Sequence, residues 1–590
     1  MQRLRKLVQA PFTLVLPALV LLLAVFGIPT IQLFLESVNA PSFSLQNYTS
    51  FLAQPSNIKV LFQTLKISAI VTLICFLIGY PTAYLISTAG KRARMILLVM
   101  IVIPYLTSAL ARTYSWIVIL GDNGLINSVL MDVGLISNPM PLIYNRIAVY
   151  LGMVHIMLPM MILPLVSVMM GINTSLIAAA KSMGARRSTA FWRVYFPLSM
   201  SGVRSGSLLV FVICLGFYIT PAALGGLGDA MLSTFIASQV ATGFDIGSVS
   251  ASSFVLLAIT IVLLSVVGLD LSGGEDPAPK TRISWLKRSG ILQMFRTYLN
   301  ELSVASRAKR WPLELYQVTG DLGLSRFAAA GFLTIVISFL LFPEIVVIVM
   351  SFSDGATLQF PPSGLSLQWY GSFFNEVSWY GAAWLSIKIG LWVTILSTIV
   401  GTLAAYGLSR VRSDLRSTMT MVVLTPITIP VIVVAVASYL GLSNLGLVGT
   451  ETGIVLAHVI GAISYVVVIV AATLANFDRR LEQAAQSMGA RPFRTLMRVT
   501  LPLIRPGIIG GALFAFIHSF DEVVSTSLVS GYSVRTLPLK MWENIRNEID
   551  PTVAAVASLL TLLPILWMIA LYVTWWRARA PLASPPEGIA

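Results

Sequence analysis

Two adjacent carboxylates, Asp521 and Glu522, stand in an apolar stretch at about 507–529 that is long enough to cross a bilayer. A charged side chain at bilayer depth costs about 2.5–3.5 kcal/mol on insertion scales, so it usually faces a cavity or a partner. The pair is therefore predicted to form an anionic patch that attracts a cationic solute. The alternative is a structural pairing with a cation on another helix, namely Arg112, Lys66 or Lys388.

Other polar residues of apolar stretches are candidates for the same solute pathway. His518 precedes the carboxylates by three and four residues and is predicted to share their helical face. A histidine with two acids could hold a metal, but a lone histidine is more often packed or hydrogen-bonded, so no metal site is predicted. Near the outer end of another stretch, Tyr114 and Trp116 could stack on an amine beside Arg112. An interfacial aromatic belt is the favoured alternative for Trp116.

Several kinds of catalytic or cofactor chemistry have no sequence signal. Cys75 and Cys214 lie inside apolar stretches and predict no disulfide framework, and the histidines lack zinc-type spacing. The phosphate-binding pattern G-x-x-x-x-G-K-[ST] does not occur. The chain is therefore predicted to be no enzyme, to bind no cofactor and to leave ATP hydrolysis to another subunit.

A short basic segment occurs twice, at an offset of 305 residues, each time between apolar stretches. The second copy is preceded by Glu482, and Gly184 and Gly489 are expected to form the two turns because glycine tolerates backbone conformations that other residues avoid. Two copies predict two docking points for one kind of partner. The candidate docking residues are Ala179, Ala180, Ser182, Met183, Gly184 and Ala185 in the first copy and Glu482, Ala484, Ala485, Ser487, Met488, Gly489 and Ala490 in the second.

Each copy contains Ala-Ala-x-x-x-Gly-Ala with a proline thirteen residues after the glycine, at Pro197 and Pro502. This pattern resembles the "EAA" loop of permease subunits of bacterial binding-protein-dependent ABC importers. The resemblance implies that each loop forms a coupling helix that docks on an ATPase. The sequence departs from the motif at its glutamate, where Ala178 and Gln483 stand, although Glu482 lies one residue earlier.

Further residues resemble the permease subunits of spermidine/putrescine importers: Phe520 to Val523, Arg535 to Thr552 and, in the first half, Arg112 to Trp116. The resemblance implies a type I ABC importer permease for a polyamine or related cationic amine. Ferric-iron, opine and aminoethylphosphonate permeases share much of the pattern and remain alternatives. The implied partners are an ABC ATPase homodimer carrying ATP and Mg, a periplasmic or lipid-anchored solute-binding protein, the small-molecule solute and membrane lipid.

Composition independently indicates an integral membrane protein. Hydrophobic residues make up 56% of the 590 residues and charged residues only 11%, and about a dozen stretches could span a bilayer. The net charge of +15 fits an excess of cations on cytoplasmic loops, so nucleic acid is not an expected partner. We expect a multi-pass protein of the bacterial inner (plasma) membrane with both termini cytoplasmic.

These elements predict an all-α fold of two parallel six-span repeats, about twelve transmembrane helices in all. The first repeat is expected at 1–270, a cytoplasmic basic linker at 271–326 and the second repeat at 327–590. The docking loops are expected at 172–204 and 476–506, and the third span at 95–120. An ion-coupled secondary transporter and a membrane scaffold without transport are rivals, and neither requires two matched basic loops. Co-purification with an ATPase distinguishes the importer from both.

Overall fold

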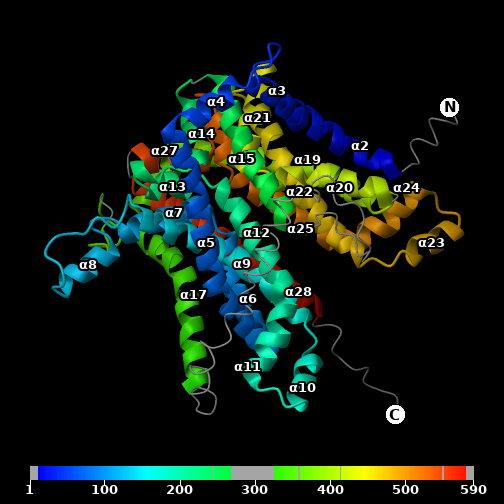
Figure 1. Ribbon diagram of the computed structural model, residues 1–590, viewed down its shortest axis with the longest axis horizontal. Helices are drawn as coiled ribbons and strands as arrows, with labels where there is room; N and C mark the ends of the chain where they lie inside the picture. Colours follow the sequence, from blue (N-terminus) through cyan, green and yellow to red (C-terminus); the bar gives the residue numbers. More distant parts are fainter. Residues whose placement is uncertain are drawn as a thin grey trace.

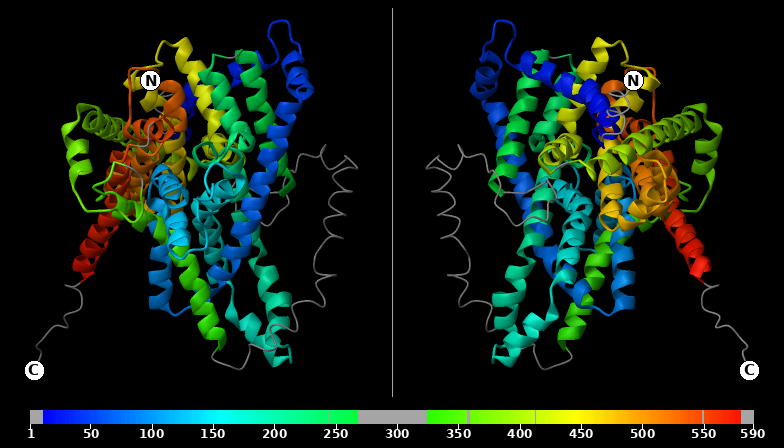
Figure 2. Two further views of the ribbon diagram at one scale, coloured as in Figure 1. Left: turned by 90° about the vertical axis from the view of Figure 1, so that its left-hand side faces the viewer. Right: turned by 90° about the vertical axis from the view of Figure 1, so that its right-hand side faces the viewer.

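The protein is described here from a computed structural model that covers residues 11–243, 245–267, 324–356, 359–411, 413–547 and 550–579. The described residues are mostly helical and contain no β-strand, only an isolated bridge between Ser353 and Leu365. The first and second halves of the chain lie side by side (Figures 1 and 2). The predicted all-α fold is confirmed, whereas the linker predicted at 271–326 falls outside the described residues up to residue 323.

The helices follow the same order in the two halves. The first half contains α2 (Pro11–Leu22), α3 (Ile28–Ser37), α4 (Gln46–Ala53), α5 (Pro55–Thr88), α6 (Lys91–Leu106), α7 (Ala109–Leu120), α8 (Leu125–Asp132), α9 (Arg146–Gly171), α10 (Thr174–Ser182), α11 (Arg187–Ala190), α12 (Phe196–Leu215), α13 (Ile219–Leu224), α14 (Leu232–Ala241) and α15 (Ile246–Val267). The second half contains α17 (Leu324–Met350), α18 (Gln368–Asn375), α19 (Val377–Leu408), α20 (Ser413–Thr428), α21 (Val431–Asn444), α22 (Glu451–Ala475), α23 (Arg480–Ser487), α24 (Pro492–Thr495), α25 (Leu501–Phe520), α26 (Val524–Val529), α27 (Leu537–Asn547) and α28 (Thr552–Arg579).

Within the described residues, nine helices are long and apolar enough to cross a membrane, and two bent helix pairs raise the number to eleven. The twelfth predicted span corresponds to α28, whose side chains are described only as far as Leu566. The third span predicted at 95–120 is not straight, because α6 and the helix after it meet at 91°. Its counterpart, α20 with α21, bends by 99°. Both bends follow a proline near the end of the first helix, Pro104 or Pro426.

The predicted limits of the docking loops were too wide. The spans that follow them begin at Arg187 and Pro492, so only short turns separate these helices from α10 and α23. The helix that follows each docking loop passes through a π-helical turn, Phe191–Tyr195 in the first half and Leu496–Thr500 in the second. The basic side chains that suggested a loop therefore stand on helices that extend beyond the apolar region.

The span predicted at about 507–529 and its counterpart in the first half, which was expected to continue to about Leu224, are also interrupted. The helix α12 ends at Leu215 and α13 begins at Ile219, while α25 ends at Phe520 and α26 begins at Val524. Asp521 and Glu522 thus lie in a non-helical break, and the prediction that they occupy the middle of one helix was wrong. The break exposes backbone groups that need other partners, which bears on the site below.

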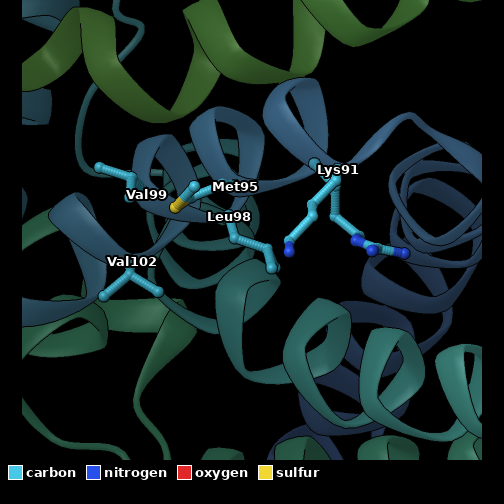
Figure 3. A pocket seen from close by; sticks show the side chains of 6 residues that line it. Lys91, Met95, Leu98, Val99 and Val102 are labelled. Atoms are coloured by element: carbon cyan, nitrogen blue, oxygen red, sulfur yellow. The ribbon is translucent and has the colours of Figure 1, made fainter. Parts of the chain in front are cut away.

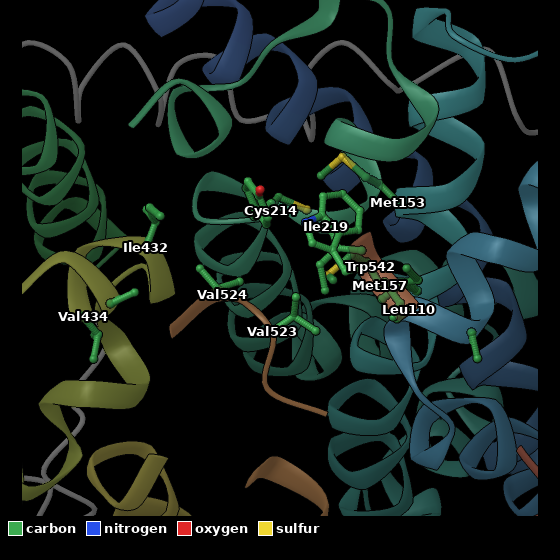
Figure 4. Close-up of a cluster of buried hydrophobic side chains, with 14 of the residues drawn as sticks. Leu110, Met153, Met157, Cys214, Ile219, Ile432, Val434, Val523, Val524 and Trp542 are labelled. Atoms are coloured by element: carbon green, nitrogen blue, oxygen red, sulfur yellow. The ribbon is translucent and has the colours of Figure 1, made fainter. Parts of the chain in front are cut away.

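The first helix of each half packs on the other half. In the first half, α5 packs on α9 and α12, as α19 packs on α22 and α25 in the second. The segment α2–α3 contacts α19 and α21, and α17 contacts α7 and α28. The buried core is continuous across this exchange: Leu110 and Met157 of the first half lie near Val523 and Trp542 of the second (Figure 4).

Candidate docking loops and solute pathway

The two predicted docking segments have the same backbone geometry. Each short helix, α10 or α23, ends at a glycine in the left-handed region, with φ of +85° at Gly184 and +84° at Gly489. The amide of Ala185 donates to the carbonyl of Ala180, and that of Ala490 donates to Ala485, both at 3.0 Å. With the glycine amides donating to Lys181 and Gln486 at 2.9 Å, these bonds form a Schellman motif in each loop.

The glycines are required because other residues rarely adopt a φ near +85°. Lack of space is not the reason, since a Cβ atom at either position would meet nothing within 4 Å. The turns also expose an apolar side chain at the same place, since Met183 and Met488 are each 82% exposed. By contrast, Ala180 and Ala485 are buried at the base of the turns. The other predicted docking residues, Ala179, Ser182, Ala484 and Ser487, lie on α10 and α23 themselves. The two loops project at separate ends of the molecule (Figure 1).

The second loop is fastened to its own half by a buried charge. Glu482 is only 7% exposed; its carboxylate pairs with Arg410, next to the end of α19, and accepts a hydrogen bond from the Thr500 hydroxyl at 2.6 Å. The Arg410 guanidinium also lies 5.0 Å from the centre of the Tyr406 ring. Glu482 therefore holds α23 against the turn between α19 and α20 and against the π-helical segment Leu496–Thr500 that follows it.

The first loop is fastened by aromatic packing at the equivalent positions. Glu482, Thr500 and Arg410 correspond to Ile177, Tyr195 and Thr88. The Tyr195 ring stacks on Phe191 and meets Tyr84 edge-on, with ring centroids 5.8 and 5.1 Å apart. Its hydroxyl lies 3.2 Å from the Ser87 hydroxyl.

Asp521 joins the two halves at the start of α7. Its carboxylate accepts hydrogen bonds from the Ser108 hydroxyl and, at 3.1 Å, from the amide of Ala109. A carboxylate is favoured there because the first amides of a helix have no partner within the helix. Asp521 is in this respect a structural contact of α7, while the neighbouring Glu522 accepts from the amide of Ser525 at 2.7 Å and caps α26.

A third acid, Glu344 of α17, completes this arrangement and was missed in the sequence. It is 4% exposed and accepts hydrogen bonds from Thr107 at 2.8 Å and from Thr561 at 3.1 Å. The buried guanidinium of Arg112 is within electrostatic range of Glu344 and Asp521 but forms no ion pair with either among the described residues. An acid after Pro343 in an apolar span was the same signal that drew attention to Asp521, so it could have been found.

The three cations considered as partners of Asp521 lie in different surroundings. Arg112 lies with the acids and donates to the carbonyls of Thr107 and Ser108 at 3.2 and 3.4 Å. Lys388 instead forms an ion pair with Glu451 at 2.7 Å, and Lys66 is exposed. Of the three cations considered for Asp521, only Arg112 binds the same turn, since both contact Ser108, and no ion pair joins the two among the described residues.

Four buried polar atoms near α7 have no hydrogen-bond partner among the described residues. They are Arg112 Nη1, Tyr114 Oη, Trp116 Nε1 and His155 Nδ1. Trp116 is buried against His155 and Phe339, both with ring centroids 5.7 Å away, so the interfacial-belt interpretation was wrong. Folded proteins usually satisfy such atoms with ordered water or a bound molecule.

His518 lies apart from these atoms. Its ring packs beside Tyr465, with centroids 5.1 Å apart, and Nε2 lies where a Cβ on Gly461 would be placed. Among the described residues no group of three His, Cys, Asp or Glu side chains could hold a metal ion.

The stretch Arg535 to Thr552 contributes a further contact between halves. Trp542 of α27 packs on Tyr218, in the break between α12 and α13, with ring centroids 5.4 Å apart, and Arg546 lies over the Trp542 ring. On the same helix, the Lys540 ammonium lies 4.6 Å from the centre of the Trp379 ring.

The fold and these sites define a multi-pass membrane protein of two like halves, each with one projecting helix-turn element. The chain belongs to the family of binding-protein-dependent transport system inner membrane components, whose model matches residues 76–271 and 397–575. It is accordingly a fused permease of the type I ABC importer class, with one copy of the family domain in each half.

Known relatives include permeases of polyamine transport systems. The spermidine/putrescine transport system permease protein PotB of Haemophilus influenzae is 37% identical over 221 residues, which are 37% of this chain and 77% of that protein. PotB of Escherichia coli is 31% identical over 224 residues, 38% of this chain and 81% of that protein. PotC of Escherichia coli is 30% identical over 250 residues, 42% of this chain and 93% of that protein.

A chain from the crystal structure of a bacterial ABC transporter involved in the import of the acidic polysaccharide alginate also matches. It has a TM-score of 0.36 and 18% identity, covering 43% of this chain and 96% of that one.

Proposed function

We propose that this permease imports a small cationic amine of the polyamine class, which a solute-binding protein delivers and a separate ATPase dimer drives across the bacterial inner membrane. The observation that carries the importer mechanism is the matched pair of Schellman turns, each presenting an exposed methionine. Two like surfaces suit two like partner subunits, because each subunit then meets the same geometry. ATP and Mg belong to that partner.

The amine assignment is supported by the polyamine permeases among the relatives and by two acids at the contact between halves, the buried Glu344 and the half-buried Asp521. Buried acids in a membrane protein commonly mark a solute path. Their present hydrogen bonds to helix ends and hydroxyls describe one conformation, and a change between inward- and outward-facing states repacks these contacts. Asp521 is the acid most directly placed between the halves.

A second candidate is a zwitterionic amine that also carries a carboxylate or phosphonate, such as an opine or aminoethylphosphonate. Arg112 Nη1 and Trp116 Nε1 are buried donors without a partner among the described atoms. A donor pair of this kind satisfies an anionic group, which a polyamine lacks. The second candidate therefore requires Arg112 as a ligand for its anionic group, whereas a polyamine does not.

Reconstitution of the purified chain with its ATPase and binding protein in proteoliposomes tests the mechanism. Uptake of labelled spermidine that requires internal ATP and all three components is the expected result. Uptake driven by an ion gradient without ATPase would favour the secondary-transporter rival, and failure of the ATPase to bind would remove the importer mechanism.

The solute is tested separately with Asp521→Asn, which removes the charge and keeps one of the two acceptor oxygens. We expect spermidine uptake to fall at least tenfold, while ATPase binding and basal hydrolysis stay unchanged. Normal uptake by this variant would refute the role of Asp521. A binding protein that retains only zwitterionic amines would select the second candidate.

A further inference from the structure

A groove along a partly exposed face of α6 shares no lining residue with the candidate solute pathway or the docking loops. It has a volume of about 380 Å³ and is open rather than enclosed. Figure 3 shows Lys91 at one end of the row of lining side chains and Val102 at the other. The lining residues are Lys91, Arg94, Met95, Leu98, Val99 and Val102.

The six residues form one stripe of the helix. Their spacing of three, one, three, one and three residues brings them to a single face, because residues three and four apart are neighbours on an α-helix. The first turn supplies two cations, and the next two turns of the stripe supply only apolar side chains. From Lys91 to Val102 the helix rises by about 16 Å.

This length matches one leaflet of a bilayer. The hydrocarbon core is roughly 30 Å thick, so one leaflet contributes about 15 Å. A molecule that fits the stripe carries negative charge at one end and an apolar chain of leaflet length at the other. Since the cationic end follows α5 at a cytoplasmic turn predicted from its excess of cations, that leaflet is the inner one.

The cations are available for such a ligand. Lys91 is exposed and Arg94 half-buried, and none of the ion pairs among the described residues includes either of them. Arg94 donates only a long bond, 3.5 Å, to the carbonyl of Ser87. Met95 and Val99 are 54% and 43% exposed, so the apolar part of the stripe lacks a protein cover.

We propose that this groove binds an anionic phospholipid of the inner leaflet, with its phosphate at Lys91 and Arg94 and one acyl chain along Met95, Leu98 and Val99. Basic pockets beside membrane helices on the cytoplasmic side suit anionic headgroups. The chain's own segment 271–326 is a poorer occupant on charge grounds, because it is rich in lysine and arginine. A soluble partner could reach the cations but not the apolar residues within the span.

The second half offers a matched control, because its equivalent stripe differs in chemistry. The part of each half before the docking loop repeats at an offset of 322 residues, which relates Pro104 to Pro426. At this offset, the stripe of the second half has one cation, Arg416, and polar side chains where the first half has Met95 and Leu98. The complete set is Ser413, Arg416, Ser417, Thr420, Met421 and Leu424. A lipid site that depends on the whole stripe is thus expected in the first half alone.

The test uses the full chain in nanodiscs of phosphatidylglycerol and phosphatidylcholine in equal amounts, with retained lipid counted by native mass spectrometry. We expect the wild type to retain phosphatidylglycerol preferentially. Arg94→Gln and Lys91→Gln should each weaken its retention about fivefold, which corresponds to about 1 kcal/mol per cation near the membrane surface. Val99→Trp should reduce retention by filling the groove, whereas Arg416→Gln should leave it unchanged.

Equal losses in Arg94→Gln and Arg416→Gln would overturn the proposal, since they would indicate a general effect of surface charge. Wild-type protein that shows no preference between the two lipids would also overturn it. An Arg94→Cys variant that crosslinks to the ATPase, together with lipid retention that is unaffected by Arg94→Gln, would also overturn it. Unchanged thermal unfolding of the variants confirms that each one is folded in the comparison.

Discussion

The two halves share a backbone plan but hold corresponding contacts with different chemistry. Asp521 caps the start of α7, whereas its counterpart Gly216 packs so closely on Pro430, at the start of α21, that a Cβ would lie 2.9 Å from the proline side chain. The docking loops repeat this contrast, with Glu482 in the second half and an aromatic cluster in the first. The same geometry can thus be maintained by charge or by close packing, and removing one partner affects the two very differently.

The largest expected effect is at the charged contact between halves. In Arg112→Met, the carbonyls of Thr107 and Ser108 lose their donor, at about 1–3 kcal/mol for each buried acceptor left unpaired, and Glu344 and Asp521 lose a cation within electrostatic range. The thermal unfolding temperature in nanodiscs should fall markedly. Combining Arg112→Met with Glu344→Gln and Asp521→Asn should restore much of the loss, because residues in one network are not additive. If the stability effects of the three substitutions simply add in the triple variant, the three groups do not interact.

The next effect concerns the second docking loop alone. Glu482→Gln removes the charge that pairs with Arg410 and keeps the shape, and a hydrogen bond to a charged group contributes about 1.5–3 kcal/mol. We expect faster hydrogen exchange in α23 with no change in α10. Equal acceleration in both helices would contradict the idea that each loop is fastened by its own half.

The shared turn geometry predicts equal effects at its two glycines. Gly184→Val and Gly489→Val each force a β-branched residue to φ near +85°, at a cost of roughly 1–2 kcal/mol for the left-handed conformation. ATPase affinity should drop by about tenfold in either variant, and asparagine, which tolerates this region, should cost less. Titration of purified ATPase measures both, and a large difference between the two positions would show unequal docking.

The smallest effect is expected at the aromatic attachment of the first loop. Tyr195→Phe removes the hydroxyl contact with Ser87 and leaves the ring packing in place, so the cost should be about 1 kcal/mol or less. Hydrogen exchange of α10 should barely change. A response as large as that of α23 to Glu482→Gln would mean that polar bonds, rather than rings, hold the first loop as well.

The all-α fold, the repeated halves and both turn glycines could be predicted, because apolar length and repeated motifs are properties of local sequence. The breaks at Gly216–Tyr218 and Asp521–Val523 could not, because apolar residues continue on both sides of each break. The partner of Asp521 was also beyond prediction in detail: Arg112 was one of three cations considered, and the capped amide of Ala109 carries no sequence signal. Long-range packing decides such contacts.

The exchange of first helices has a consequence for the timing of assembly. The segment α2–α3 packs on α21, whose residues are synthesised about 400 positions later, or roughly 20–80 s at typical translation rates. Until then α3 has only first-half neighbours such as α15, where Phe34 packs on Phe254 with ring centroids 5.3 Å apart, and α2 lies in lipid without α19. Its mean hydropathy of 2.6 is among the highest of the described spans, and only 28% of its most apolar window is buried in the finished fold. A helix whose contacts with the second half form late is thus one that lipid alone solvates well.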